Sequence, residues 1–290
     1  LIILIGLILG PSIAFVYILF KDYFDDTVKS PKDIEDHNIN FLSWVPRLNN
    51  SEIQHSNQEL LVLYEPNSPI SESFRAITAR IEYSRADSKF PKLILVTSPA
   101  EQEGKTFVSF NLAGSFAHSN MRTLLIDCDL RRPKIHTIMG VDKKQGLVDH
   151  LFNNVKLEEI IRKTKVDNLS YITSGSIPSD STRVLKSEKM KDFLQGIKDF
   201  FDVIILDTPP IVAVIDAEIL GKIVDGTILV VAADKTENKL MMDAVDIIRR
   251  DKIPFLGTVL NNFQYKNGYG YYYKYYYNYS SSKGKDKKNH

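Results

Sequence analysis

Six short hydrophobic runs, rich in β-branched residues, alternate along the chain with segments of helical length. They lie at residues 93–98, 123–129, 169–174, 202–210, 226–234 and 255–262. Because these runs are continuously apolar, they predict strands that are buried on both faces. Strands of this kind, separated by helices, form a parallel sheet with helices on both sides. The chain is therefore predicted to be an α/β protein with a Rossmann-like, mostly parallel central sheet.

The first 20 residues form one uncharged apolar stretch. A helix of this length measures about 30 Å, the thickness of the hydrocarbon core of a bilayer. The stretch lacks the basic leader and cleavage site of a signal peptide, so residues 1–20 are predicted to be a transmembrane helix. Lys21, Lys29 and Lys32 follow its downstream end, which predicts that the rest of the chain is cytoplasmic. Since the chain begins with Leu1, we expect a fragment of a longer protein.

Residues 21–57 are charged, interrupted by prolines and nearly aperiodic, apart from a short helix predicted at 31–37. This pattern is typical of a linker, here a juxtamembrane one. A helical period begins at 71, where Ser71 is the expected N-cap and opens the soluble domain assigned to residues 58–264. The apolar face of this helix consists of Phe74, Ile77 and Ile81.

The composition changes in residues 265–290, which hold nine of the fourteen tyrosines among Gly, Asn, Lys and Ser. No helical or strand period is present, so this segment is predicted to be a disordered tail. Its phenols are candidate phosphorylation sites, and each phosphate would add about −1.5 to −2 charge. The alternative is a low-complexity tail that stacks on a partner or on itself. The tyrosines are Tyr265, Tyr269, Tyr271, Tyr272, Tyr273, Tyr275, Tyr276, Tyr277 and Tyr279.

Overall charge and cysteine content narrow the function classes. A formal net charge of +1 gives no nucleic-acid signature. The single cysteine, Cys128, cannot form an internal disulfide, which fits a reducing compartment. Asp127 and Asp129 should raise its pKa, so we interpret Cys128 as a buried, unreactive side chain.

A phosphate-binding loop is predicted where the first core strand meets a helix, at Gly104-Lys105-Thr106. Backbone amides would cradle phosphate oxygens, Lys105 would reach the β- and γ-phosphates, and the Thr106 hydroxyl would bind Mg²⁺. The first glycine of the usual GxxxxGK(S/T) motif is replaced by Pro99. Glu101 and Glu103 add negative charge that would weaken ATP binding.

Three aspartates lie toward the ends of two predicted strands, at the carboxyl edge of the sheet: Asp127, Asp129 and Asp207. Ligands of open α/β sheets bind at this edge, so the three carboxylates are expected to converge on one Mg–nucleotide. A strand-end aspartate can also be a helix N-cap, but three together favour the binding site.

Together these motifs resemble those of the bacterial tyrosine kinases attached to polysaccharide co-polymerases. The family's Walker A motif matches residues 104–106, its hydrophobic DxDxR motif matches 124–131, and its Walker B motif matches 204–210. Its ExxRxxxxR motif matches Glu72, Arg75 and Arg80, and its tyrosine cluster matches the tail. The resemblance covers nearly all of the chain.

The resemblance implies a P-loop kinase that uses ATP and Mg²⁺ to phosphorylate its own tail tyrosines in trans, within a ring-shaped oligomer, an octamer in the family. It further implies a place in the bacterial inner membrane, with the kinase domain cytoplasmic, and control of capsule or exopolysaccharide polymerisation and export. The implied partners are a cognate phosphatase and the polymerase and export machinery.

Site roles follow from the same resemblance. Lys105 would stabilise phosphate charge, Thr106 with Asp129 or Asp207 would hold Mg²⁺, and Asp127 would be the base for the phenol. Arg131 would face the nucleotide or a neighbour, unless it is only a surface charge.

Two further groups have alternatives within the chain. Glu72, Arg75 and Arg80 would form a subunit contact, although Glu72 and Arg75 are also spaced to pair on one helix. Asn261 or Asn262 would meet the adenine, or would simply form a strand-end turn.

Departures from the family leave rival functions open. Residues 180–183 replace the family's Asn-Pro-x-Glu stretch, and Ala232 replaces an arginine often found on the fifth strand. One rival is a membrane-associated ATPase of the MinD/ParA type, but its signature lysine is Ala100 here. The other is a nucleotide-gated scaffold that hardly transfers phosphate.

Overall fold

The structure is a computed structural model that describes residues 10–12, 15–17, 20, 23–48, 60–65, 68–83 and 90–264. Most of the predicted transmembrane helix (1–20) and the whole tyrosine-rich tail (265–290) lie outside these residues. Within the described ranges, no helix has the length and apolar character needed to cross a bilayer.

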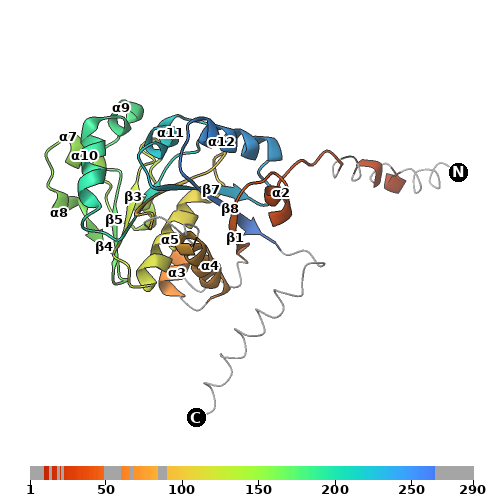
Figure 1. Cartoon of the computed structure of the whole chain (residues 1–290), viewed down its shortest axis with the longest axis horizontal. Coiled ribbons are helices and arrows are strands. Elements are labelled where there is room, and N and C mark those ends of the chain that lie inside the picture. The colour runs from red at the N-terminus through yellow and green to blue at the C-terminus, as the bar shows by residue number, and fades with distance from the viewer. Residues whose placement is uncertain are drawn as a thin grey trace, which may run out of the picture.

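An eight-stranded sheet forms the centre of the molecule, in the order β1-β8-β7-β2-β6-β3-β5-β4 (Figure 1). Only the β4–β5 pair is antiparallel, and the other neighbours are parallel. The predicted mostly parallel sheet is thus confirmed, with all six predicted strands in place. The strands are β1 (Phe41–Pro46), β2 (Leu93–Thr97), β3 (Thr123–Asp127), β4 (Arg162–Lys163), β5 (Leu169–Ile172), β6 (Val203–Asp207), β7 (Gly226–Ala232) and β8 (Phe255–Phe263).

Helices cover both faces of this sheet (Figure 1). Alternate residues of β2 separate the two layers: Ile94 and Val96 pack in one core cluster with Phe74 of α4, and Leu93 and Leu95 pack in another with Phe193 of α10. This is the two-faced burial that the continuously apolar runs predict. The helices are α2 (Pro31–Glu35), α3 (Leu61–Tyr64), α4 (Pro69–Tyr83), α5 (Lys105–His118), α6 (Ile135–Ile138), α7 (Leu147–Phe152), α8 (Leu157–Ile160), α9 (Ser181–Leu185), α10 (Glu188–Ile197), α11 (Asp216–Gly221) and α12 (Asn238–Arg250).

The edge strand β1 lies inside the segment 21–57 that the sequence assigns to a linker. It pairs in parallel with β8, and Leu42 and Val45 are buried. Further upstream, Val28 is fully buried and its N–H donates to the Thr236 carbonyl at 2.8 Å. The folded unit therefore includes residues upstream of 58. The sequence did not predict β1, because its partner strand β8 is far away in the chain and because β1 ends in a proline. A proline is tolerated at the end of an edge strand.

Helix α4 starts earlier than predicted. The assignment of Ser71 as N-cap is wrong, because the helix begins at Pro69 and Ser71 is fully buried within it. The Ser71 N–H instead donates to the Ser68 hydroxyl at 3.2 Å, as expected for a cap just before a proline at the first helical position. Phe74, Ile77 and Ile81 are all fully buried, which confirms the predicted apolar face.

Candidate nucleotide site

The phosphate-binding loop connects β2 to α5. Gly104 caps α5 with a φ of +88°, and Gln102 also has a left-handed backbone, with a φ of +60°. A Cβ atom on Gly104 would collide with the side-chain amide of Asn261, so only glycine fits there. The first amides of α5 have no acceptor within the helix, and a left-handed residue before them forms an anion-binding concavity. The predicted loop and its context are present.

Lys105 is the first residue of α5, directly after Gly104. Its Nζ forms an ion pair with Asp129 Oδ2 at 3.0 Å, while Asp129 Oδ1 accepts the Arg132 N–H at 3.0 Å. Burial alone would lower the pKa of Lys105, but Asp207 and Asp129 outweigh it and raise this pKa above its ordinary value. The ammonium therefore stays charged, as phosphate binding requires.

Asp207 ends β6 directly behind the loop and is fully buried. Thr106 Oγ1 donates to its Oδ2 at 2.8 Å, and Ser109 Oγ donates to its Oδ1 at 3.0 Å. Burial raises the pKa of Asp207, although Lys105 opposes this. Ser109 is a residue that the sequence motifs did not single out, since it lies beyond the GKT triplet.

Asp127 lies opposite Asp207 in the β3–β6 register. Its Oδ2 accepts the N–H groups of Lys134 and Ile135 at 3.1 and 3.0 Å, at the start of α6. Its Oδ1 is buried without a partner among the described residues. Burial, and then the charge of Asp207, raise the pKa of Asp127 well above its usual value. One oxygen thus accepts the first N–H groups of α6, although the N-cap residue of that helix is Lys134 and not Asp127. The other oxygen is free to bind a proton.

Cys128, between Asp127 at the end of β3 and Asp129 just beyond it, is fully buried and reduced. Burial first, and Asp127 second, raise the pKa of its thiol well above the usual value. The interpretation as an unreactive packing residue is confirmed.

The oxygen atoms gathered here fit Mg²⁺ chemically. In the described part of the chain, no group of three or more His, Cys, Asp or Glu side chains could hold a metal by itself. Mg²⁺ in nucleotide sites usually takes one or two protein ligands and completes its shell with phosphate oxygens and water. Thr106, Asp129 and Asp207 supply a hydroxyl and carboxylates of that kind.

Arg131 is turned toward another partner. It contacts both carboxylate oxygens of the fully buried Asp216, at 2.7 and 3.1 Å, and donates to Thr182 Oγ1 at 2.9 Å. The hydrogen bond to Asp216 is the main cause of its raised pKa. Thr182 belongs to the 180–183 stretch that departs from the family, and neither it nor Asp216 was predicted.

Both glutamates of the phosphate-binding loop, Glu101 and Glu103, have partners within the chain. Glu101 forms an ion pair with Arg132. Glu103 is buried, where its Oε2 accepts the Ala100 N–H at 2.9 Å and its Oε1 accepts the Thr236 hydroxyl at 2.5 Å. Burial raises the pKa of Glu103 to about 7, so near neutral pH it carries only part of the negative charge that the sequence suggests.

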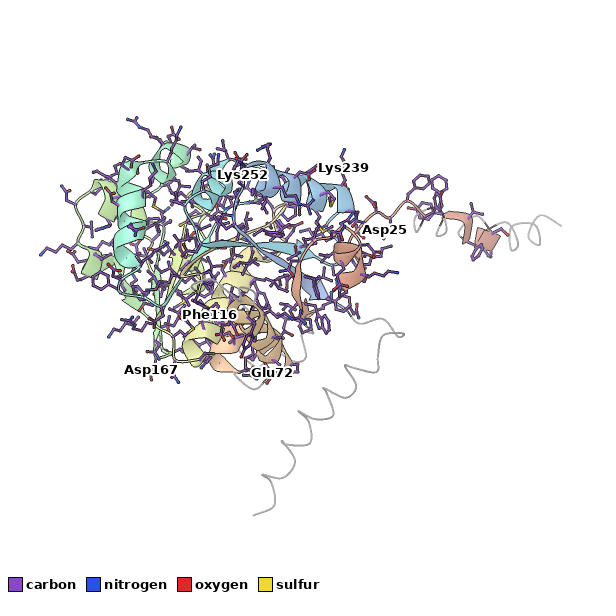
Figure 2. The ribbon with its side chains drawn as sticks, viewed as in Figure 1. Asp25, Glu72, Phe116, Asp167, Lys239 and Lys252 are labelled. Carbon is purple, nitrogen blue, oxygen red and sulfur yellow. The ribbon has the colours of Figure 1, made fainter. Side chains whose placement is uncertain are left out.

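The residues predicted for subunit contact lie on α4. Arg75 pairs with Glu72, the local alternative, and Figure 2 shows Glu72 at the periphery of the molecule. Arg80 donates to the Leu42 carbonyl and lies over the Phe41 ring, 6.0 Å from its centroid. These contacts are within the chain, and the role in assembly stays a prediction. Asn261, in contrast, reaches the loop, where its Nδ2 donates to the Glu103 carbonyl at 2.9 Å.

Comparison with known proteins shows that the chain is similar to bacterial tyrosine-protein kinases. Residues 92–257 match the model of a family described as AAA domain. The chain is 35% identical to the tyrosine-protein kinase YwqD of Bacillus subtilis over 204 residues, which cover 70% of this chain and 86% of that protein. It is 28% identical to the tyrosine-protein kinase wzc of Salmonella typhi, covering 93% of this chain and 39% of that protein.

Solved structures agree. The chimerical protein CapA2B2 superposes with a TM-score of 0.75 at 27% identity, covering 81% of this chain and all of that one. The kinase domain of the Escherichia coli tyrosine kinase ETK gives 0.74 at 26% identity, covering 83% of this chain and all of that one. The cell-division ATPase MinD of Pyrococcus furiosus is more distant, with a TM-score of 0.52 over 61% of this chain and 74% of that one, at 25% identity.

Proposed function

Since the chain belongs to the family of bacterial tyrosine-protein kinases, we propose that it transfers the γ-phosphate of ATP to tyrosine hydroxyls, including those of its own tail. The observation that carries this proposal is the meeting of Lys105, Thr106 and three strand-end aspartates at the loop between β2 and α5.

Each of these residues has a task that suits its surroundings. Lys105 stays charged and would neutralise the γ-phosphate as its bond to the β-phosphate breaks. Thr106 and Asp207, with Asp129, would hold Mg²⁺, which when bound draws charge from the phosphate oxygens. Asp127, buried with one free oxygen, would take the proton of the attacking phenol. A phenol has a pKa of about 10, so orienting it contributes as much as removing the proton.

Beyond the catalytic domain, the proposal follows the family. The phosphate acceptors would be the nine tail tyrosines, modified in trans by a neighbour in a ring, which in this family is an octamer. The N-terminal segment would tether the ring to the inner membrane with the kinase in the cytoplasm. There it would control capsule or exopolysaccharide polymerisation and export, and a tyrosine phosphatase would reset it.

A MinD-like ATPase is the less favoured function, because Ala100 stands where the signature lysine would be and the MinD structure is the more distant match. A nucleotide-gated scaffold would use the same Lys105, Thr106 and Asp207, so only chemistry separates it from a kinase.

The test is intact-mass spectrometry of phosphatase-treated protein incubated with Mg–ATP. We expect mass steps of single phosphates that map to residues 265–279 and are absent in Lys105→Met. Replacing the nine tail tyrosines by Phe should abolish phosphate incorporation but leave nucleotide binding intact. An unmodified tail with ADP still released would favour the ATPase, and ATP binding without either product would favour the scaffold.

A further inference from the structure

The outer side of the phosphate-binding loop is held by side chains that the catalytic assignment does not use. Lys235, in the turn between β7 and α12, donates from Nζ to the Gln102 carbonyl at 2.8 Å and to the Glu101 carbonyl at 3.2 Å. Asn261 at the end of β8 donates to the next carbonyl, that of Glu103. Three consecutive loop carbonyls therefore accept hydrogen bonds from two side chains.

The neighbouring residue in that turn holds the loop by a side chain. Thr236 Oγ1 donates to Glu103 Oε1 at 2.5 Å and accepts the Ala232 N–H at 2.9 Å. Thr236 is buried, and its own N–H donates to the Ala232 carbonyl at 3.0 Å. The Thr236 hydroxyl is thus held at the end of β7, and its hydrogen bond holds the Glu103 side chain there as well.

Peptide geometry gives these contacts a consequence on the other side of the loop. In a trans peptide the carbonyl of one residue and the N–H of the next point in opposite directions, and the described residues contain no cis peptide. The carbonyls at 101 and 102 face the β7–α12 turn, and the carbonyl at 103 faces Asn261 of β8. They therefore aim the N–H groups of the following residues, 102, 103 and 104, away from these two elements. Those are the amides that would cradle a phosphate.

We propose that Lys235 and Thr236 are positioning residues of the nucleotide site, which hold the loop carbonyls and the Glu103 side chain outward so that the loop amides converge on the phosphates of ATP. The inference rests on the proposed function and adds to it two residues outside the family's motifs. Gln102 needs such support, because a left-handed backbone is unfavourable for a residue other than glycine. The gain would be a loop ordered before the nucleotide arrives, so that binding loses less entropy.

The test compares Lys235→Met and Thr236→Val with Lys239→Met, which removes a similar exposed lysine at the second position of α12, away from the described loop contacts. Isothermal titration would measure ADP affinity, and tail phosphorylation would give KM and kcat. We expect both loop variants to weaken ADP binding and raise KM for ATP by about tenfold, with kcat within about twofold. That size fits the loss of the two hydrogen bonds that each side chain makes. Lys235→Arg and Thr236→Ser, which keep the donors, should stay near the unaltered protein.

Several outcomes would overturn the proposal. ADP affinity in both variants equal to that of Lys239→Met would show that the contacts do not order the loop. Weakened binding in Lys235→Met but not in Thr236→Val would indicate a direct charge effect on the phosphates instead. Because ADP binding is measured without catalysis, the positioning role stays testable if tail phosphorylation is never observed, and that second result would count only against the kinase proposal. Thermal melting of each variant would separate misfolding from weak binding, and Thr236→Ser provides a folded comparison.

Discussion

At the scale of single residues, the site depends on buried carboxylates whose charge the fold controls. Asp127 and Asp207 lie opposite each other in adjacent strands, and burial raises the pKa of both. Lys105 lies nearby with a raised pKa, so the cluster balances several negative groups against one cation. A bound Mg²⁺ would shift this balance toward ionised carboxylates, which links metal binding to proton release.

Glu103 gives a direct test of such burial. Its pKa is about 7 in the folded protein and 4.5 ordinarily, so folding favours its protonated form. That contribution is complete below pH 4.5 and is lost as pH rises through about 7, which amounts to about 3 kcal/mol at 1.36 kcal/mol for each pH unit. Glu103→Gln cannot ionise. As pH rises from 4.5 to above 7, we therefore expect the free energy of unfolding to fall by about 3 kcal/mol more in the unaltered protein than in Glu103→Gln.

Urea unfolding of both proteins across this pH interval would measure the difference between their free energies of unfolding. The contributions of the other titrating groups are common to both proteins and cancel in this difference. Glu101→Gln is the matched control, because Glu101 lies in the same loop but is half exposed in its pair with Arg132. Parallel pH profiles for unaltered protein and Glu103→Gln would mean that Glu103 is ionised in the folded state.

At the scale of elements, β1 connects the early part of the chain to the sheet, and Arg80 connects β1 to α4. The Arg80 guanidinium donates to the Leu42 carbonyl and covers the Phe41 ring. Arg80→Ala should therefore destabilise the monomeric domain by about 1 kcal/mol, through the lost hydrogen bond and ring contact. Urea unfolding at concentrations where the protein is monomeric would measure this.

Glu82→Ala, an exposed change on the same helix, serves as the control for Arg80→Ala. If Arg80 acts only between subunits, the two variants will have equal monomer stability and differ only in assembly. A loss in both measurements would mean that the arginine supports the sheet edge from which a subunit contact is built.

Each element that the sequence predicted is indicated by a pattern of neighbouring residues. The six core strands are continuously apolar, and the phosphate-binding loop follows one of them within a few residues. Strand β1 and the partner of Arg131 depend on contacts across the chain: β1 pairs with β8, and Asp216 lies 85 residues beyond Arg131. Likewise, nothing near Glu103 in the sequence indicates that Thr236 covers its charge. Local patterns thus predicted the layers and the edge of the sheet that carries the phosphate-binding loop, and missed the side chains that support this loop from outside.

At the scale of the whole molecule, the described end of the chain lies beside the phosphate-binding loop. Strand β8 runs parallel to β7, and Asn261 near its end contacts the phosphate-binding loop. Tyr265 follows Asn261 by only four residues. An extended chain spans at most about 3.3–3.6 Å per residue, so the fifteen residues to Tyr279 could cover about 50 Å. That reach suits a neighbouring subunit as well as the chain's own site, and is compatible with transfer in trans.

If each tail occupies its neighbour's site in a ring, phosphorylation should open the ring. Nine phosphates would add about −13 to −18 charge to a segment whose own charges at 265–279 are Lys266 and Lys274, so tails brought together would repel. We expect phosphorylated protein to sediment as smaller species than phosphatase-treated protein, measured by analytical ultracentrifugation. The repulsion is screened over about 3 Å at 1 M salt, so high salt should restore the larger species. A protein with all tail tyrosines changed to Phe should keep one size under both treatments, and equal sizes for phosphorylated and dephosphorylated unaltered protein would refute the ring cycle.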